Sequence, residues 1–428
     1  MMNNLRNACL SAALGLSIST SLQAQTQGTY AFTNVNVVPM TSEAVLTNQT
    51  VVVRNGRITT VGPANRVTVP NNAIRIDGRG KFLMPGLAEM HGHIPGQNTA
   101  FAERVSFLYV AGGVTTVRGM QGHPNQLELR RRVNAGAVIG PRMILSSPPL
   151  SGNSVSDVGQ ADSIVRAHKS AGYDLLKIHE GLSRAVYDRI ATTAHALKLP
   201  FGGHVPNDVG VLAALAARQT TIDHLDNYVD LIDSEMDIAQ LAEQTVKAGV
   251  ALVPTMPLWE VLRGLHDPAT MMDRPELRYM PPQMVTQWRN QVANIRAQTN
   301  QQAAAREIEL RNKMLKALSD AGAQLLLGSD APQLFSVPGF SVQREMETWV
   351  AAGIPVFKVL QAGTTAVAKH LHDEASSGTV SVGKRADLLL LDGNPLDDIR
   401  NVGRKTGVMV NGRWLPWSDI EKRLAAQN

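Results

Sequence analysis

Five short motifs in this chain bring together side chains of the kinds that bind metals. Each lies where a hydrophobic, strand-like run gives way to a polar or Gly/Pro-rich stretch. Four of their histidines, one lysine and one aspartate form the set that a two-metal hydrolytic site requires. The motifs are, in chain order, Met90-His91-Gly92-His93, Leu176-Lys177-Ile178-His179, Gly203-His204-Val205, Ile222-Asp223-His224 and Gly328-Ser329-Asp330.

The spacing within and between the motifs indicates how these side chains converge. His91 and His93 are two residues apart, and residues i and i+2 of a strand point to the same side, so both imidazoles can face the mouth of a barrel. His204 and His224 are 20 residues apart, one compact strand–helix repeat, which places them on adjacent strands. Lys177 ends an apolar run in which its ammonium is unfavourable to bury; the alternative is a lysine that extends from the strand end to water.

Strand-like and helix-like segments alternate through the middle of the chain. Helical patterns cover residues 126–135, 182–197 and 209–217. Eight strand–helix units in series favour an α/β fold, a TIM-like (β/α)8 barrel, over an open sheet. The strands are expected to end near His91, Arg118, Ser146, Lys177, His204, His224, Pro254 and Ser329.

The two ends of the chain carry β-branched runs that are typical of short strands. Asn55-Gly56 and Asn411-Gly412 each separate two such runs, and Asn-Gly is the strongest short hairpin signal. These patterns predict one small β-sandwich domain built jointly from residues 25–84 and 379–428. The barrel is expected to occupy residues 85–378 between them.

A long connection, residues 255–324, follows the seventh expected strand. It opens with a Met- and Pro-rich loop that contains Trp259 and continues as a polar helical stretch over 283–321. A segment of this size after a barrel strand is suited to cover an active site. An oligomer contact or a simple surface elaboration explains the pattern equally well.

The first 24 residues have the pattern of a secretory signal peptide. Arg6 supplies the positive start, residues 9–22 are apolar or small and uncharged, and Ala24 fits a cleavage site. The run is too short to span a membrane, and an uncleaved N-terminal extension is the alternative. Cys9 is the only cysteine and lies in this segment, so the mature protein is expected to be free of disulfides and periplasmic or secreted.

The composition limits the partners of the chain. Its 428 residues, 44% of them hydrophobic, suffice for a sizeable core and more than one domain. The net charge of +5 comes from 41 basic and 36 acidic residues, without a Lys/Arg block that would follow phosphates. We therefore expect a small-molecule substrate, no nucleic acid, and no membrane after signal cleavage. A homo-oligomer stays open.

A resemblance to a known family begins at the first motif. Residues 84–93, with the sequence MPGLAEMHGH, resemble the first-strand signature of the amidohydrolase superfamily, whose members are metal-dependent (β/α)8 hydrolases. The later motifs resemble its fourth-, fifth-, sixth- and eighth-strand positions. Residues 112–118 and 378–388 resemble its second strand and its return to the β-sandwich, so nearly the whole mature chain is covered. The imidazolonepropionase-like and Xaa-Pro-dipeptidase-like subgroup is the most similar, although Gly119 stands where that subgroup often has an acidic residue.

The resemblance implies a binuclear site, with Zn²⁺ as the expected metal. In such a site a hydroxide that bridges two ions attacks the substrate. Asp330 is the catalytic residue that would take its proton and pass it to the leaving nitrogen. The implied ligands are His91, His93 and Asp330 for one divalent metal, His204 and His224 for the other, and Lys177, carbamylated by CO2, as the bridge between them.

This site predicts an enzyme that hydrolyses amide (C–N) bonds, with dipeptides or N-acyl amino acids as candidate substrates. Hydrolysis of a cyclic amide, a lactone or an ester on the same site is the alternative. A third hypothesis is a barrel that binds without catalysis. Retention of all six candidate ligands argues against it, because a binding barrel has no need of them.

Four further residues follow strands two, four and six and are candidate substrate contacts. The guanidinium of the first could pair with a carboxylate in a bidentate manner. For each of them, a structural hydrogen bond or a solvated side chain is at least as well supported as a role in binding. They are Arg118, His123, His179 and Tyr228.

Overall fold

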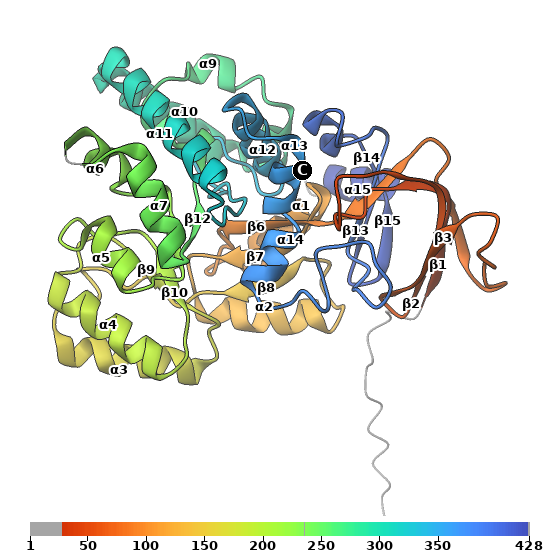
Figure 1. Ribbon diagram of the computed structural model, residues 1–428, viewed down its shortest axis with the longest axis horizontal. Helices are drawn as coiled ribbons and strands as arrows, with labels where there is room; N and C mark the ends of the chain where they lie inside the picture. The colour runs from red at the N-terminus through yellow and green to blue at the C-terminus, as the bar shows by residue number, and fades with distance from the viewer. Residues whose placement is uncertain (1–27, 235, 427–428) are drawn as a thin grey trace, which may run out of the picture.

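Parallel strands arranged in a ring form the centre of the molecule (Figure 1). The structure is a computed structural model that describes residues 28–234 and 236–426. The predicted signal peptide, residues 1–24, lies outside the described residues, as does its cysteine. The ring strands are β6 (Leu87–Gly92), β7 (Val114–Gly119), β8 (Arg142–Leu145), β9 (Leu176–Ile178), β10 (Phe201–Gly203), β11 (Thr221–Asp223) and β12 (Ala251–Val253).

The ring closes through an extended segment at residues 324–329. The backbone N of Leu252 donates to the carbonyl of Gln324 at 2.9 Å, and that of Met90 donates to Leu327 at 2.8 Å. These bonds join β12 to β6, and the backbone bond from Ser147 to Leu175 at 2.8 Å joins β8 to β9. The closed (β/α)8 barrel confirms the predicted fold class. Each of the seven assigned strands ends within one residue of its expected position.

Helices follow the strands and cover the outside of the ring (Figure 1). Their ends obey local capping rules: Asp157 accepts the first free N–H groups of α3, and Gly172, at φ 89°, ends it. None of the described helices is both long and apolar enough to cross a membrane. The bounds are α1 (Thr99–Ala111), α2 (Pro124–Asn134), α3 (Val158–Ala171), α4 (Arg184–Ala196), α5 (Gly210–Ala216), α6 (Tyr228–Ser234), α7 (Ile238–Ala248), α12 (Ser341–Ala351), α13 (Val356–Ala362) and α14 (Thr365–His370).

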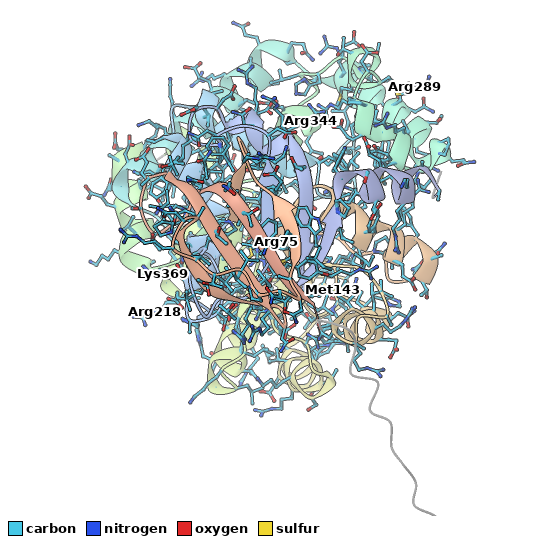
Figure 2. All side chains as sticks on the ribbon, turned by 90° about the vertical axis from the view of Figure 1, so that its right-hand side faces the viewer. Arg75, Met143, Arg218, Arg289, Arg344 and Lys369 are labelled. Carbon is cyan, nitrogen blue, oxygen red and sulfur yellow. The ribbon has the colours of Figure 1, made fainter. Side chains whose placement is uncertain are left out.

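Both ends of the chain build one mixed sheet beside the barrel. Figure 2 shows strands from the two ends next to one another, and their order is β15-β14-β13-β5-β1-β2-β3, with β4 beside β1. Through Gly86, β5 runs directly into β6, so this sheet leads into the first barrel strand. The bounds are β1 (Thr29–Val37), β2 (Leu46–Arg54), β3 (Arg57–Pro63), β4 (Ile74–Asp77), β5 (Phe82–Pro85), β13 (Leu388–Leu391), η2 (Ile399–Gly403), β14 (Lys405–Val410), β15 (Arg413–Pro416) and α15 (Trp417–Ala425).

The two Asn-Gly turns of this sheet are present as predicted. Asn55 and Gly56 have φ values of 51° and 73°, and Asn411 and Gly412 have 49° and 72°, as a two-residue hairpin turn with both φ angles positive requires. The turns also touch, because a Cβ added to Gly412 would overlap the Cα of Gly56. Glycine is therefore needed here for its size as well as its backbone freedom.

The segment after β12 is a helical insertion over the barrel mouth. The sequence predicts one helical stretch over 283–321, but the structure breaks it at Thr299, and Asn300 caps a second helix. This helix, α11, packs on α6, α7 and α8, and its Arg311 donates a 2.7 Å hydrogen bond to the carbonyl of His224. The insertion comprises α8 (Met256–Leu262), α9 (Pro268–Met271), η1 (Pro275–Tyr279), α10 (Pro282–Gln298) and α11 (Gln301–Ala321).

Candidate metal centre

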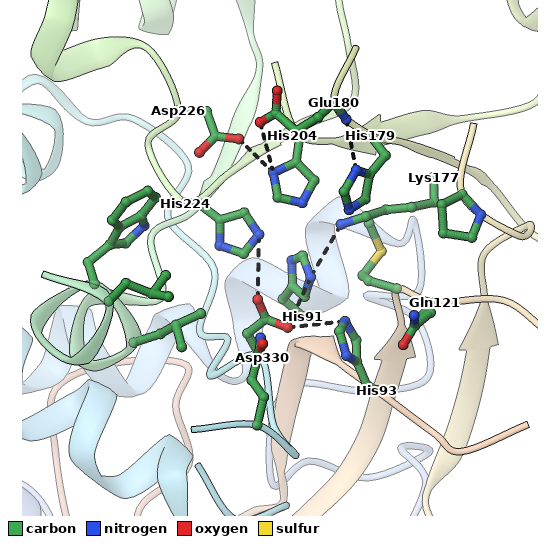
Figure 3. Close-up of a pocket in the computed structure, with 16 residues that line it drawn as sticks. His91, His93, Gln121, Lys177, His179, Glu180, His204, His224, Asp226 and Asp330 are labelled. Atoms are coloured by element: carbon green, nitrogen blue, oxygen red, sulfur yellow. Dashed lines mark hydrogen bonds and ion pairs between the residues drawn. The ribbon is translucent and has the colours of Figure 1, made fainter. Parts of the chain in front are cut away.

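A cavity of about 270 Å³ lies at the carboxyl ends of the barrel strands (Figure 3). Parallel strands of a barrel end at the same face, so residues distant in sequence meet there. The six side chains predicted as metal ligands all line this cavity: His91, His93, Lys177, His204, His224 and Asp330.

Asp330 is the point at which three imidazoles meet. Its Oδ1 lies 3.1 Å from Nε2 of His93 and 3.6 Å from Nε2 of His91. Its Oδ2 lies 3.7 Å from Nε2 of His224. Oδ1 is buried and, among the described residues, makes no hydrogen bond, because its contact with His93 lacks hydrogen-bond geometry; Nε2 of His224 is buried and unpaired in the same sense. Divalent cations bound in the cavity would satisfy both atoms.

Three of the imidazoles are fixed by a partner on Nδ1. His91 donates from Nδ1 to Oδ2 of Asp223 at 2.7 Å, and both side chains are buried. His204 donates in the same way to Oδ2 of Asp226 at 2.8 Å. The third contact joins Nδ1 of His224 to the Thr255 hydroxyl at 2.7 Å. With the proton held on Nδ1, the lone pair of Nε2 is free to bind a metal, which is the usual outer-shell arrangement of metal-ligating histidines.

Burial favours the neutral, metal-binding form of the His91, His93 and His224 imidazoles. It lowers the pKa of His91 and of His224 well below the ordinary histidine value, with nearby cationic groups as the next cause. Burial also lowers the pKa of His93 to about 3. The same burial raises the pKa of Asp330 well above the ordinary carboxyl value, so its charged form calls for a cation beside it.

Lys177 lies inside the cavity and does not extend to water. It is 1% exposed, and its Nζ lies 3.3 Å from Nε2 of His91. Burial lowers its pKa, which favours the neutral amine that reacts with CO2. Gly203, at φ 123°, leaves room for the lysine stem, because a Cβ there would lie 2.9 Å from Cδ of Lys177. This surrounding fits a carbamylated lysine, although the carbamate itself stays a prediction.

Three residues of the cavity region have a left-handed backbone at consecutive strand ends. The φ angles are 66° at His224, 52° at Thr255 and 57° at Asp330. Such a conformation is unfavourable for residues other than glycine, by about 1–3 kcal/mol each. It persists where the surrounding structure enforces it, and here it accompanies the convergence of His224, its partner Thr255 and Asp330.

Two buried carboxylates behind His91 have no role in the sequence-based prediction. Glu89 accepts hydrogen bonds from the backbone N of His91 at 3.0 Å and from the backbone N of Ser329 at 2.8 Å, and burial raises its pKa to about 7. Asp223 bonds the ring of the same histidine. Both interrupt apolar strand runs, so the argument that singled out Lys177 could also have found them.

The whole-chain comparisons agree with this geometry. The sequence pattern of the amidohydrolase family matches residues 82–415. The chain belongs to this family. The match confirms the predicted resemblance and the predicted class of enzyme, a hydrolase of C–N bonds.

Individual relatives of this amidohydrolase are distant. An adenine deaminase of Rubrobacter xylanophilus is 23% identical over 368 residues, which are 84% of this chain but 53% of that protein, so the chain spans about half of its relative's length. A bottromycin amidohydrolase superposes with a TM-score of 0.74 at 22% identity, over 94% of this chain and 91% of its own. A Xaa-Pro dipeptidase with bound methionine gives 0.70 at 18% identity, over 91% and 100%. At these identities the structures establish the fold alone.

Three of the four residues predicted to contact substrate lie elsewhere in the amidohydrolase barrel. Arg118 is 1% exposed and points into the barrel interior, where it donates to both carboxylate oxygens of Asp223 at 3.1 Å. His123 caps the N-terminus of α2 through Nδ1. The hydroxyl of buried Tyr228 bonds that of Thr245 at 2.9 Å. Their side-chain directions depend on distant neighbours, which strand-end positions do not specify.

His179 is the one of the four that reaches the cavity. Its ring lies 4.5 Å from that of His204, and burial lowers its pKa to about 4. The remaining wall of the cavity comes from residues that the sequence did not single out as ligands or substrate contacts, three of them from the predicted covering segment 255–324. They are Met120, Gln121, Pro149, Glu180, Asp226, Leu258, Trp259, Leu262 and Gln333.

Proposed function

We propose that this protein is an exported, binuclear metal-dependent hydrolase that cleaves amide bonds of small molecules. The observation that carries the proposal is the convergence of four imidazoles, one lysine and one aspartate on a single cavity of an amidohydrolase barrel. Export rests on the pattern of residues 1–24 alone. The relatives support hydrolysis of a C–N bond but no particular substrate, because their names refer to different compounds: adenine, bottromycin and Xaa-Pro dipeptides.

The free ring nitrogens and the buried carboxylate support the ligand assignment that the family resemblance implies. When bound, two divalent cations, Zn²⁺ in the first instance, supply Lewis acidity toward the scissile carbonyl and the attacking water. The residues that would hold them are His91, His93 and Asp330 for one ion, His204 and His224 for the other, and carbamylated Lys177 between them.

The chain's own groups have separate tasks in the reaction. Asp330 would take the proton of the attacking water on its carboxylate and return it to the leaving nitrogen. Asp223 would keep His91 in one tautomer and orientation. Trp259, on the wall formed by α8, would restrict access of bulk water during the reaction.

The test is metal content measured together with hydrolysis. The purified protein is stripped with a chelator, reloaded with Zn²⁺, Mn²⁺ or Co²⁺, and assayed on dipeptides, N-acyl amino acids, their neutral amides, lactones and esters. We expect two metal ions per chain, loss of amide hydrolysis on stripping, and its return on reloading. Lactone or ester cleavage faster than that of any amide would favour the alternative reaction. A protein that binds no metal and cleaves nothing would support a non-catalytic barrel.

A further inference from the structure

The cavity has an apolar wall that the insertion supplies. The α8 residues Leu258, Trp259 and Leu262 line it together with Met120, which follows β7. Leu258 and Met120 are buried, so this wall is a continuation of the core that reaches the catalytic space. An apolar substituent of a substrate would be desolvated against it.

Two arginines lie behind this wall, and their charges are paired with other groups of the protein. The guanidinium groups of Arg311 and Arg263 lie 3.6 Å and 4.6 Å from the ring centre of Trp259. Arg311 also donates to Glu307 at 3.1 Å and to the backbone carbonyl of His224, and Arg263 donates to Glu307 at 2.5 Å. Neither arginine lines the cavity, so their contacts stiffen the wall and leave no guanidinium for a substrate anion.

Apart from the proposed metal ions, the exposed charge that side chains contribute to the cavity surface is negative. Among the described residues that line it, Lys177 is the only lysine or arginine, and it is buried against His91. Two carboxylates beyond Asp330 also line it, and Figure 3 shows both beside His204. Asp226 is committed to the ring of His204, whereas the Glu180 side chain is 51% exposed and its nearer oxygen lies 3.9 Å from that ring. Glu180 therefore faces an incoming substrate as a partly exposed anion, without a lysine or arginine partner among the described residues that line the cavity.

The two features occupy different parts of the ring. Glu180 follows β9, the fourth barrel strand, and the α8 part of the apolar wall follows β12, the seventh. A substrate that lies across the centre would contact both. A substrate carboxylate would meet Glu180 without an arginine or an exposed lysine to neutralise it, and a like charge at such range lowers binding by about tenfold or more.

We propose that this site selects amides with an apolar group and a neutral or positively charged group, and disfavours substrates that carry a carboxylate. The inference rests on the proposed function and narrows it. Free dipeptides and N-acyl amino acids, the substrates expected from the sequence, both carry a carboxylate and become poor candidates. The apolar group packs on the wall of Met120, Leu258, Trp259 and Leu262, and the neutral or cationic group lies toward Glu180.

The test uses three amides that share one acyl group. Hexanoylglycine, hexanoylglycinamide and N-(2-aminoethyl)hexanamide have an anionic, a neutral and a cationic amine part, and all release hexanoate, which is quantified for each with the metal-loaded full chain. We expect kcat/KM to be at least about tenfold higher for the neutral and cationic amides than for the anionic one. Equal or faster cleavage of hexanoylglycine would overturn the inference while leaving the proposed function intact.

Two variants test whether Glu180 causes the preference for neutral and cationic amides. Glu180→Gln should raise kcat/KM for hexanoylglycine and lower it for the cationic amide, so that the ratio between them shrinks by about tenfold. Glu421→Gln removes the same charge from exposed α15, beside the sheet of the chain ends, and should leave that ratio unchanged. An unchanged ratio in Glu180→Gln would contradict the role of this carboxylate.

A binding measurement separates failure of the inference from failure of the proposed function. If none of the three amides releases hexanoate, the proposed amide hydrolysis is contradicted. The dissociation constants of the same compounds, measured by calorimetry, then decide the inference. Binding of hexanoylglycine at least about tenfold weaker than that of the other two supports it, and equal or tighter binding overturns it.

Discussion

Oδ2 of Asp223 lies 2.7 Å from Nδ1 of His91, and both side chains are buried beneath the cavity. The carboxylate also accepts two hydrogen bonds from Arg118, so it couples β11 to β7 and to the first candidate ligand strand, β6. The ring of His91 is thereby held in one tautomer, with Nε2 toward Asp330 at 3.6 Å.

Asp223→Asn is therefore expected to weaken metal binding before it affects the fold. Loss of an outer-shell carboxylate of this kind typically reduces metal affinity by about 10–100-fold. The measurement is a metal titration of stripped protein, with circular dichroism to confirm that the variant is folded. Thr255→Val is a second test of the same role, because it removes the Nδ1 partner of His224 without leaving an arginine unpaired. It should also weaken metal binding. Wild-type affinity in both variants would contradict the orienting role.

Lys177→Ala should abolish turnover and reduce the number of bound metal ions below two per chain. Among the described residues, Lys177 is the one lysine that lines the cavity, and its buried amine lies 3.3 Å from Nε2 of His91. Wild-type protein loaded in the presence of ¹³C-labelled bicarbonate should give a carbamate carbon signal in the NMR spectrum, and the variant should lack it. Full activity in Lys177→Ala would contradict the assignment of Lys177 as the ligand between the two metal ions.

Asp330→Asn tests proton transfer separately from the assembly of the site. An amide cannot take the proton of the attacking water, and loss of a general acid–base group typically lowers the rate by about 10²–10⁴-fold. We expect kcat to fall by this much while KM changes little. Because Asp330 is also a candidate ligand, metal content is measured on the same samples. A variant that keeps both ions and the wild-type kcat would exclude the role in proton transfer.

Lys405 should make stability depend on pH in the alkaline range. Burial in β14 lowers its pKa to about 8 from the ordinary 10.5. Between these two values the unfolded chain binds more protons than the folded one, so the free energy of unfolding rises with pH there; below about 8 both states are charged, and the penalty of burial is complete. The rise contributed by this lysine is about 3 kcal/mol.

The measurement is urea unfolding of wild type and Lys405→Met at several pH values between 7 and 10. Tyrosines and other groups titrate in both proteins, so the difference between them isolates the lysine. We expect the variant to be the more stable at pH 7 and its advantage to shrink as the pH rises. An advantage that is constant over this range would show that the buried lysine keeps its ordinary pKa.

Much of the barrel could be predicted because its signals are local. A strand that ends at His91 or His224 gives way to polar or Gly/Pro-rich sequence at that place, and the order of such places along the chain defines the barrel. The Asn-Gly turns are local in the same sense, since both residues of the turn need positive φ angles. The helix break at Thr299 was missed because an alanine- and glutamine-rich stretch favours helix on both sides of it.

The sequence by itself determined which residues meet: the strand ends bearing His91, His93, Lys177, His204, His224 and Asp330 share one face of any closed parallel barrel. Only the tertiary structure decided what each side chain does there. Arg118 lies at the end of its strand just as His91 does, yet it points inward to Asp223 because that buried carboxylate needs a cation. The apolar wall around Trp259 and the exposed carboxylate of Glu180 likewise come from segments far apart in the chain. Which of their side chains are buried, and which charges are paired, depends on how these segments pack together.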